Sequence, residues 1–202
     1  MDDAKFIEEV QEFVRLIVAR GDRTFADVLE QAVDTFNEEY DDKDTVERTC
    51  EAEIEKAFAS HLAAQATWPQ VTDCDRLDRA FETLNQGGIL ARHDFSCCQN
   101  CGLSEIGNDI RTAIDAGVDV SGFTFYHTQD TDSAAGGRGL YLTYGHMDGG
   151  EVAGVAIGRI IVNALNEAGL ETNWDGTFGK RIGVRLDWKR RISKHAAISA
   201  AP

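Results

Sequence analysis

Residues 93–103 read HDFSCCQNCGL, and this stretch decides how the second half of the chain is interpreted. It contains three of the five cysteines. The apolar run 89–95 predicts a strand that leads into it, and apolar residues at helical spacing from Leu103 to Ile114 predict a helix that leads out. We therefore predict a strand-to-helix turn crowded with thiols.

After this turn, the chain contains several short apolar runs and one more stretch with apolar residues at helical spacing. The runs predict strands, and the stretch predicts a helix over 152–168. The predicted strands are residues 122–127, 140–144, 171–174 and 182–186, and the polar, glycine-containing segment 129–138 is predicted as a loop. Together with the strand 89–95 and its helix, this is the β-α-β-β-α-β order of a ferredoxin-like domain with one extra strand. The predicted fold class is α+β, with an antiparallel sheet and both helices on one face.

The N-terminal third is predicted to be helical. Apolar residues recur at helical spacing in 4–20, 25–40 and 44–66, which predicts three amphipathic helices in a small bundle. Cys50 and His61 lie on the apolar face of the third helix, where core packing is the expected role.

A boundary follows this bundle. Trp68-Pro69 interrupts the helical pattern, and Thr72 with Asp75 then forms the capping box of a further helix. The predicted domains are an acidic helical region at 1–67, an α+β domain with the cysteine cluster at 68–190, and a tail at 191–202.

The formal charge of −15 is concentrated in the first part of the chain. Residues 1–82 hold 22 acidic and 9 basic side chains, a balance of −13. This surplus repels phosphate, which argues against general nucleic-acid binding and favours a protein partner at the acidic helical face. The C-terminal region carries a basic run, for which we expect a solvated tail or a partner for the chain's own acidic helices, with contact to nucleic acid or an acidic partner as the alternative. The run comprises Lys180, Arg181, Arg185, Lys189, Arg190, Arg191 and Lys194.

The expected compartment is the cytoplasm. The first residues, MDDAKFIEEV, do not show the basic and apolar pattern of a secretion signal. No stretch approaches the roughly 18 apolar residues that a membrane helix needs. In a reducing compartment, the five cysteines are expected to be free thiols or metal ligands in preference to disulfides.

The first interpretation of the cysteine cluster is a zinc site. Cys98-x-x-Cys101 has the spacing of two thiolate ligands to a tetrahedral ion. The candidates for the remaining ligands are Cys97, Cys74 and His93. Against zinc, the sequence has no second C-x-x-C pair, and adjacent cysteines rarely bind one tetrahedral ion without strain.

The second interpretation is thiol redox chemistry, because a helix N-terminus lowers the pKa of a thiol. A thioredoxin is excluded, since the two prolines, Pro69 and Pro202, cannot supply the cis-proline that such a site needs. The third interpretation is packing alone, with half-buried thiols in a tight turn where Gly102 permits close approach. The residues leave all three open.

A weaker polar group lies at the predicted strand end and loop that follow. His127, Gln129, Asp130 and Asp132, with His146 beyond the facing strand, can offer imidazoles and carboxylates to a ligand or metal. The alternative is an exposed turn in which aspartates cap local amides. The chain contains no G-x-S-x-G, P-loop, H-E-x-x-H or G-x-G-x-x-G motif, so no catalytic residue is predicted.

Several phrases carry a family resemblance. They are Thr72-Asp73-x-Asp75-Arg76-Leu77, Phe95-x-Cys97-Cys98-x-x-Cys101-Gly102, Gly139-Leu140-Tyr141 and Trp174-Asp175-Gly176. Over roughly residues 60–190 the chain resembles an actinobacterial family of uncharacterised cytoplasmic proteins. The resemblance implies a bacterial source and an unassigned function, and it transfers no site residue.

Three functional hypotheses follow. The first is a non-enzymatic regulatory or interaction protein in which the cysteine turn has a structural role and could bind zinc. The second is a thiol- or metal-dependent enzyme or redox sensor that uses Cys98 and Cys101, with the 127–132 segment near the same cleft. The third, an immunity-like protein that neutralises a basic toxin, rests only on the charge of residues 1–82.

Overall fold

The computed structural model describes residues 3–193 and 196, and in this part of the chain it contains seven helices and five strands. They are α1 (Asp3–Arg20), α2 (Phe25–Asn37), α3 (Lys43–Gln65), α4 (Asp73–Gln86), β1 (Ile89–Arg92), α5 (Gln99–Asp115), β2 (Gly122–Phe125), α6 (Thr128–Ala135), β3 (Leu140–His146), α7 (Glu151–Glu167), β4 (Glu171–Asn173) and β5 (Ile182–Arg185). The chain divides into two compact units, one within 1–70 and 189–202 and the other within 71–188.

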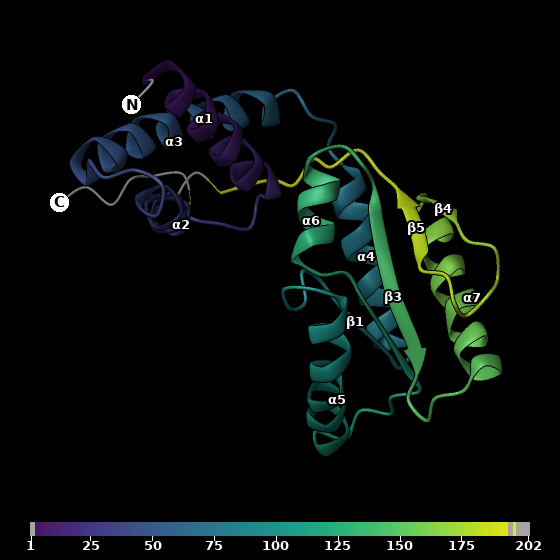
Figure 1. The fold of residues 1–202 in the computed structure, drawn as a ribbon. Helices are drawn as coiled ribbons and strands as arrows, with labels where there is room; N and C mark the ends of the chain where they lie inside the picture. Colours follow the sequence, from purple (N-terminus) through teal and green to yellow (C-terminus); the bar gives the residue numbers. More distant parts are fainter. Residues whose placement is uncertain (1–2, 194–195, 197–202) are drawn as a thin grey trace. The chain divides into compact units, whose positions relative to one another are not determined.

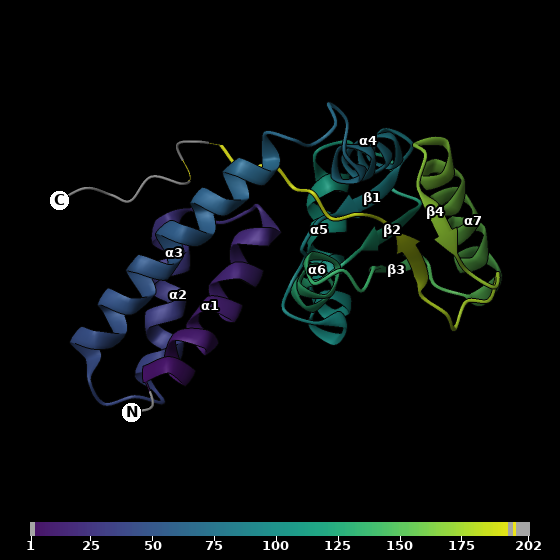
Figure 2. The same ribbon diagram turned by 90° about the horizontal axis from the view of Figure 1, so that it is seen from above.

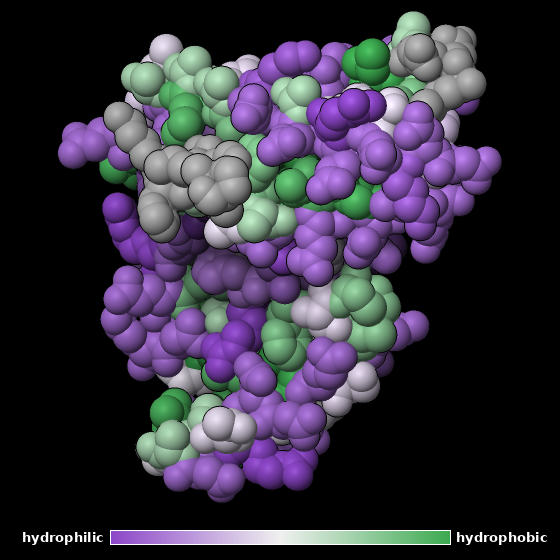
Figure 3. Space-filling model, turned by 90° about the vertical axis from the view of Figure 1, so that its left-hand side faces the viewer, coloured by the Kyte–Doolittle hydropathy of each residue, from purple (hydrophilic) through white to green (hydrophobic). Residues whose placement is uncertain are grey.

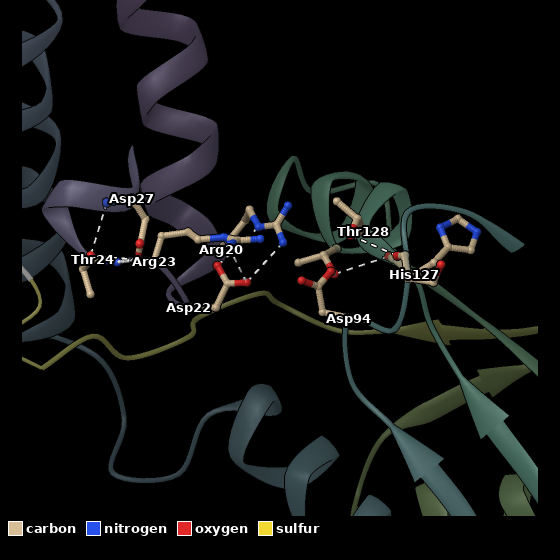
Figure 4. Close-up of polar contacts among 10 residues, drawn as sticks. Arg20, Asp22, Arg23, Thr24, Asp27, Asp94, His127 and Thr128 are labelled. Atoms are coloured by element: carbon tan, nitrogen blue, oxygen red, sulfur yellow. Dashed lines mark hydrogen bonds and ion pairs between the residues drawn. The ribbon is translucent and has the colours of Figure 1, made fainter. Parts of the chain in front are cut away.

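The first unit is a helical bundle. α1, α2 and α3 bury their apolar stripes in one core, which confirms the three predicted helices. A capping box begins α2, because Thr24 and Asp27 exchange hydrogen bonds between side chain and backbone. Figure 4 shows this box beside the ion pair of Arg20 with Asp22, which lies where α1 ends.

Part of the predicted tail belongs to this helical core. Ile192 is buried among the apolar residues of the bundle. The Gln65 side chain fixes it with two hydrogen bonds, because its Nε2 donates to the Ile192 carbonyl at 3.1 Å and its Oε1 accepts from the Ile192 N–H at 2.8 Å. Residues 191–193 are therefore packed, not a free tail. Lys194 of the predicted basic run and residues 197–202 lie outside the described residues.

The second unit is built on a mixed sheet with the strand order β1-β2-β3-β5-β4. β1 and β2 are parallel, and the other neighbours are antiparallel. The predicted α+β class is confirmed, but the predicted antiparallel ferredoxin-like order is not found. In a split β-α-β unit another strand lies between the two parallel strands, whereas here β1 and β2 pair directly.

The helices cover both faces of this sheet, as Figures 1 and 2 show. Successive residues of β1 point to opposite faces. Ile89 and Ala91 pack with α4 and α7, while Leu90 packs with α5. The prediction that the helices after the first and third strands share one face is therefore wrong. The capped helix α4 joins α7 on the first face, and this leaves the second face to α5.

The segment predicted as a loop at 129–138 contains α6. Its Asp130 accepts the backbone N–H of His127, which satisfies an amide at the helix start. Asp130, Thr131 and Ala134 form its buried side. The sequence conceals this helix because most of its buried residues are polar.

The surface drawn in Figure 3 is largely hydrophilic, and its hydrophobic residues form small groups. Within the described residues, none of the helices combines the length and the apolar character that crossing a membrane requires.

Candidate functional site: a thiol turn beside a buried histidine

Three thiols gather where the chain passes from β1 into the first turn of α5. The sulfur atoms of Cys97, Cys98 and Cys101 all lie within 4.8 Å of one another. Cys97 is exposed, and Cys98 and Cys101 are half-buried. The three thiols are close enough to hold a metal ion.

The backbone that leads to these thiols has an unusual conformation. Asp94 and Ser96 adopt positive φ values of 44° and 65°, the left-handed region that favours glycine. Each such residue costs about 1–3 kcal/mol and persists only where its surroundings hold it in place. The Asp94 carboxylate is held by the Thr131 hydroxyl, which donates to it at 2.6 Å.

Further hydrogen bonds attach this turn to the junction of β2 and α6. The Phe95 N–H donates to the Tyr126 carbonyl at 2.8 Å. The Ser96 carbonyl accepts from both the backbone N–H and the hydroxyl of Thr128, each at 3.1 Å. These contacts lie on both sides of His127 in the chain, and Figure 4 labels Thr128 and Asp94 beside it. The thiol turn and His127 are thus held against each other.

The thiols are electrostatically unequal. Cys98 is the N-cap residue of α5. The backbone N–H of Cys101 is the main group that lowers the pKa of the Cys98 thiol, with smaller contributions from the Cys101 and Cys97 thiols and the Asn100 N–H. The neighbouring Cys97 and Cys98 sulfurs in turn raise the pKa of Cys101 to about 12. The turn therefore favours one thiolate, at Cys98, in the absence of a cation.

Gly102 lets the start of α5 approach the sheet. A Cβ at this position would lie 2.5 Å from Cε2 of Phe125, whose ring is fully buried. Only a glycine fits here without displacing that ring, so the thiol turn is seated directly on β2.

An open groove of about 540 Å³ adjoins the thiols. Its lining includes Cys98 and Asn100 at the start of α5, His127, Gln129 and Asp130 at the start of α6, and Arg181. One of the thiols and the polar group near residue 127 therefore share a cleft.

A buried histidine and aspartate form the far wall of this groove. His127 and Asp130 are each only 5% exposed. The Asp130 Oδ2 atom lies 3.1 Å from Nε2 of His127 and 2.5 Å from Nη2 of Arg181. Since a carboxylate accepts hydrogen bonds, the His127 proton belongs on Nε2. Nδ1 is then a lone-pair acceptor. It is buried and makes no hydrogen bond of ordinary geometry, although the capping box at the start of α6 places the His127 side chain next to the Asp130 N–H.

The charge state of this imidazole is set mainly by burial. Desolvation lowers the pKa of His127, and the positive charge of Arg181 acts in the same direction. The carboxylates of Asp130 and Asp94 oppose the shift without reversing it. His127 is accordingly neutral at pH 7.

The other predicted metal ligands lie elsewhere. His93 stacks on Phe81 with ring centroids 4.3 Å apart, and its Nδ1 is 3.0 Å from the Tyr126 hydroxyl. Cys74 is buried, 1% exposed, in α4. Among the described residues, the group of close ligand atoms contains the three turn cysteines and neither of these two.

Two further predictions concern single polar residues. His146 accepts the N–H of Asp148 at the end of β3 and does not line the groove. The sequence places Arg181 only in a basic run, whereas in the structure it binds Asp130 and the Tyr141 carbonyl. No sequence pattern links residues this far apart, so the pairing could not have been predicted.

Comparison with known proteins identifies the family. The family described as "Domain of unknown function (DUF6891)" matches residues 3–192, and the chain therefore belongs to it. The chain matches none of the curated proteins and none of the solved structures.

Proposed function

We propose that this chain, a member of a family without an assigned function, binds one thiophilic metal ion through Cys97, Cys98 and Cys101, and that zinc is the best match. The ion would fix the turn of a regulatory or interaction protein. The observation that carries the proposal is the convergence of three sulfur atoms within 4.8 Å at a strained turn.

The donor chemistry supports zinc. Soft thiolates select zinc over magnesium or calcium, and zinc accepts tetrahedral sites with three protein sulfurs. Metal binding requires deprotonated thiols, and the backbone amides at the start of α5 already favour the thiolate of Cys98. The pKa of Cys101 is raised by hydrogen bonds with the Cys97 and Cys98 sulfurs and, second, by their negative charge, and a divalent cation bound to all three would offset both.

The surroundings support a regulatory or interaction role. The sequence contains no complete catalytic motif, and residues 1–82 carry a balance of −13. An acidic helical face suits a basic protein partner. The resemblance to actinobacterial cytoplasmic proteins extends the proposal to a reducing compartment, where thiols remain available to metal.

The test is elemental analysis of the purified chain, with free thiols counted before and after chelation. We expect about one zinc per chain, and chelation should expose three additional fast thiols. Cys50 and Cys74 are buried and should stay slow in both states. A chain without metal, whose turn thiols react equally fast with and without chelator, would contradict the proposal.

A thiol redox switch is the second candidate. It is favoured by the lowered pKa of Cys98, which is paired with Cys101 within one helical turn. In this reaction a low-molecular-weight disulfide oxidises the pair. The Cys98 thiolate attacks one sulfur of the reagent and releases the first reagent thiol. The deprotonated Cys101 sulfur then attacks the Cys98 sulfur of the mixed disulfide, which forms the Cys98–Cys101 bond and releases the second reagent thiol.

The two candidates give different outcomes in one experiment. A redox pair predicts metal-free protein with two fast thiols at Cys98 and Cys101, which glutathione disulfide converts to an intramolecular bond. A metal site predicts thiols that react quickly only after chelation. Cys97→Ser separates them further, because it removes a metal ligand and leaves the redox pair intact.

A further inference from the structure

We infer that His127 supplies the fourth protein ligand of this metal site through Nδ1, and that Asp130 is the positioning residue that holds its ring. The result is a site of three cysteines and one histidine. This inference rests on the proposed metal function and deepens it, because it closes the coordination shell and assigns the site to structural rather than open metal chemistry.

One ring nitrogen of His127 lacks a hydrogen bond. His127 is 5% exposed, and its buried Nδ1 has no hydrogen-bond partner. Buried polar atoms are rarely left unpaired, and an exception points to a missing water, ion or ligand. A neutral imidazole with its proton on Nε2 offers at Nδ1 the lone pair that a metal ion requires.

The His127 ring lies on the same groove as a thiol of the turn, the thiol of Cys98. The residues on either side of His127, Tyr126 and Thr128, bond to Phe95 and Ser96, which come directly before Cys97. Figure 4 shows the His127 ring pointing away from Asp94, so it is not used in holding this turn. The backbone hydrogen bonds therefore hold the thiol turn next to His127, and they leave the Nδ1 atom of its ring available for a metal ion.

The other ring nitrogen of His127 has a carboxylate partner. A metal-binding histidine almost always donates its second N–H to a carboxylate, carbonyl or water. Here Nε2 lies 3.1 Å from Oδ2 of Asp130. The same carboxylate is held by Arg181 at 2.5 Å, and Arg181 also donates to the Tyr141 carbonyl. Asp130, itself held by Arg181, thus fixes the orientation of the ring at Nε2, as hydrogen-bond partners of metal-binding histidines do.

The alternative fourth ligands are less suitable. His93 has Nδ1 engaged with the Tyr126 hydroxyl, and its Nε2 lies 3.7 Å from Asp78. Cys74 is enclosed in α4. Among the predicted ligands, both are already committed to packing or to other polar groups.

Closing the site requires the thiols and the His127 ring to approach one another. The three sulfurs form the group of mutually close ligand atoms, and His127 stands beside that group, not in it. Zinc lies about 2.3 Å from sulfur and about 2.0 Å from nitrogen, so the thiols must turn toward the groove when the ion binds. The exposure of Cys97 and the half-buried state of Cys98 and Cys101 leave them room to turn.

The experiment is a cobalt titration of the full-length, reduced, metal-free chain, followed by visible absorption. Cobalt(II) reports both affinity and ligand type, because its bands shift as nitrogen is exchanged for sulfur or oxygen. Wild-type protein should bind one equivalent with the spectrum of a tetrahedral site of three sulfurs and one nitrogen. His127→Ala should weaken binding by at least about 10–100-fold, the cost of losing even an outer-shell partner, and should change the band positions.

Two variants separate a ligand from a structural residue. His127→Cys should restore tight binding with a four-sulfur spectrum, an outcome that a purely structural histidine would not give. Asp130→Asn should weaken cobalt binding by about 10–100-fold with the bands in place, because the ligand remains and only its orientation suffers. His93→Asn is the matched control, and it should leave affinity and bands unchanged.

The outcomes distinguish the two levels of the proposal. If wild-type protein binds cobalt and His127→Ala shows the same affinity and spectrum, the inference is overturned while the three-cysteine site stands. If wild-type protein binds no cobalt, the proposed metal function itself is overturned. If His127→Ala does not fold, unchanged cobalt affinity in Asp130→Asn contradicts the inference.

Discussion

Cysteine and histidine occur together in two regions of this molecule, and the regions treat them differently. In the helical bundle, Cys50 lies in the core with no exposed surface, and burial raises the pKa of its thiol to about 11. The His61 Nε2 atom is 3.0 Å from the Arg190 carbonyl. In the thiol turn, amides favour the thiolate of Cys98, and one nitrogen of His127 has no partner. We call these regions the packed pair (Cys50 and His61) and the thiol turn (Cys97, Cys98 and Cys101, with His127).

The difference shows that residue type alone does not make a site. A thiol surrounded only by apolar atoms loses the solvation that its charged form needs, so it stays protonated and inert. A thiol that lies beside backbone N–H groups at a helix start has its pKa lowered and forms a thiolate more easily. The following predictions test whether this contrast is real.

The largest expected effect is on metal affinity. Cys98→Ser or Cys101→Ser should weaken zinc binding by more than about 100-fold, beyond the usual cost of losing an outer-shell partner, because each removes a direct ligand. Competition with a coloured zinc indicator measures the change. Cys50→Ala is the matched control from the packed pair, and equal losses in the control and the turn variants would remove the contrast.

The next effect is on stability. Cys50→Ser should destabilise the metal-free protein by about 1–3 kcal/mol, because it places a more polar hydroxyl in a fully buried apolar core. Because Cys97 is exposed, Cys97→Ser should change the free energy of unfolding by less than about 0.5 kcal/mol. Urea unfolding in reductant and chelator measures both. A larger loss of unfolding free energy in Cys97→Ser than in Cys50→Ser would contradict the contrast between the two regions.

A smaller effect tests how the thiol turn is seated. Gly102→Ala should destabilise the protein by about 1–2 kcal/mol, because the new methyl group meets the buried Phe125 ring. Gly107 lies in the same helix with nothing within 4 Å of an added Cβ. Gly107→Ala should therefore stabilise by about 0.5–1 kcal/mol. Thermal and urea unfolding of the two variants should move in opposite directions, and a shift in the same direction would refute this account of the turn.

The smallest effect is a pH dependence in the packed pair. Burial lowers the pKa of His61 from 6.5, opposed in part by the hydrogen bond to Arg190. The unfolded chain then binds the proton more readily than the folded chain, so this residue makes stability fall as the pH drops below 6.5. His61→Asn should flatten the dependence of the unfolding free energy on pH between about 7.5 and 5.5. An unchanged slope would show that His61 is not desolvated in the folded state.

The sequence predicted the local structure well where one physical pattern dominates. The three N-terminal helices follow from apolar spacing, and the capping box of Thr72 and Asp75 forms with hydrogen bonds of 2.7 and 3.3 Å. The strand-to-helix turn with its three thiols is also where the sequence places it. All of these depend on residues close together in the chain.

The features that the sequence did not predict depend on distant residues. The direct pairing of β1 with β2 is a choice among strand orders that local periodicity does not decide. α6 has a polar buried side because Asp130 meets Arg181, which comes 51 residues later. The sequence predicts His127 in an exposed loop. In the structure it is buried, contacts Asp130 of this ion pair and lines a groove.

The most direct test of the central claim is a zinc titration of the reduced, metal-free chain against a coloured indicator. The account predicts one equivalent bound with a dissociation constant below about 1 µM, which corresponds to about −8 kcal/mol. It also predicts that this binding disappears in the double variant Cys98→Ser, Cys101→Ser and persists in Cys50→Ala. Failure of the wild-type chain to compete for zinc, or equal competition by the double variant, would contradict the account.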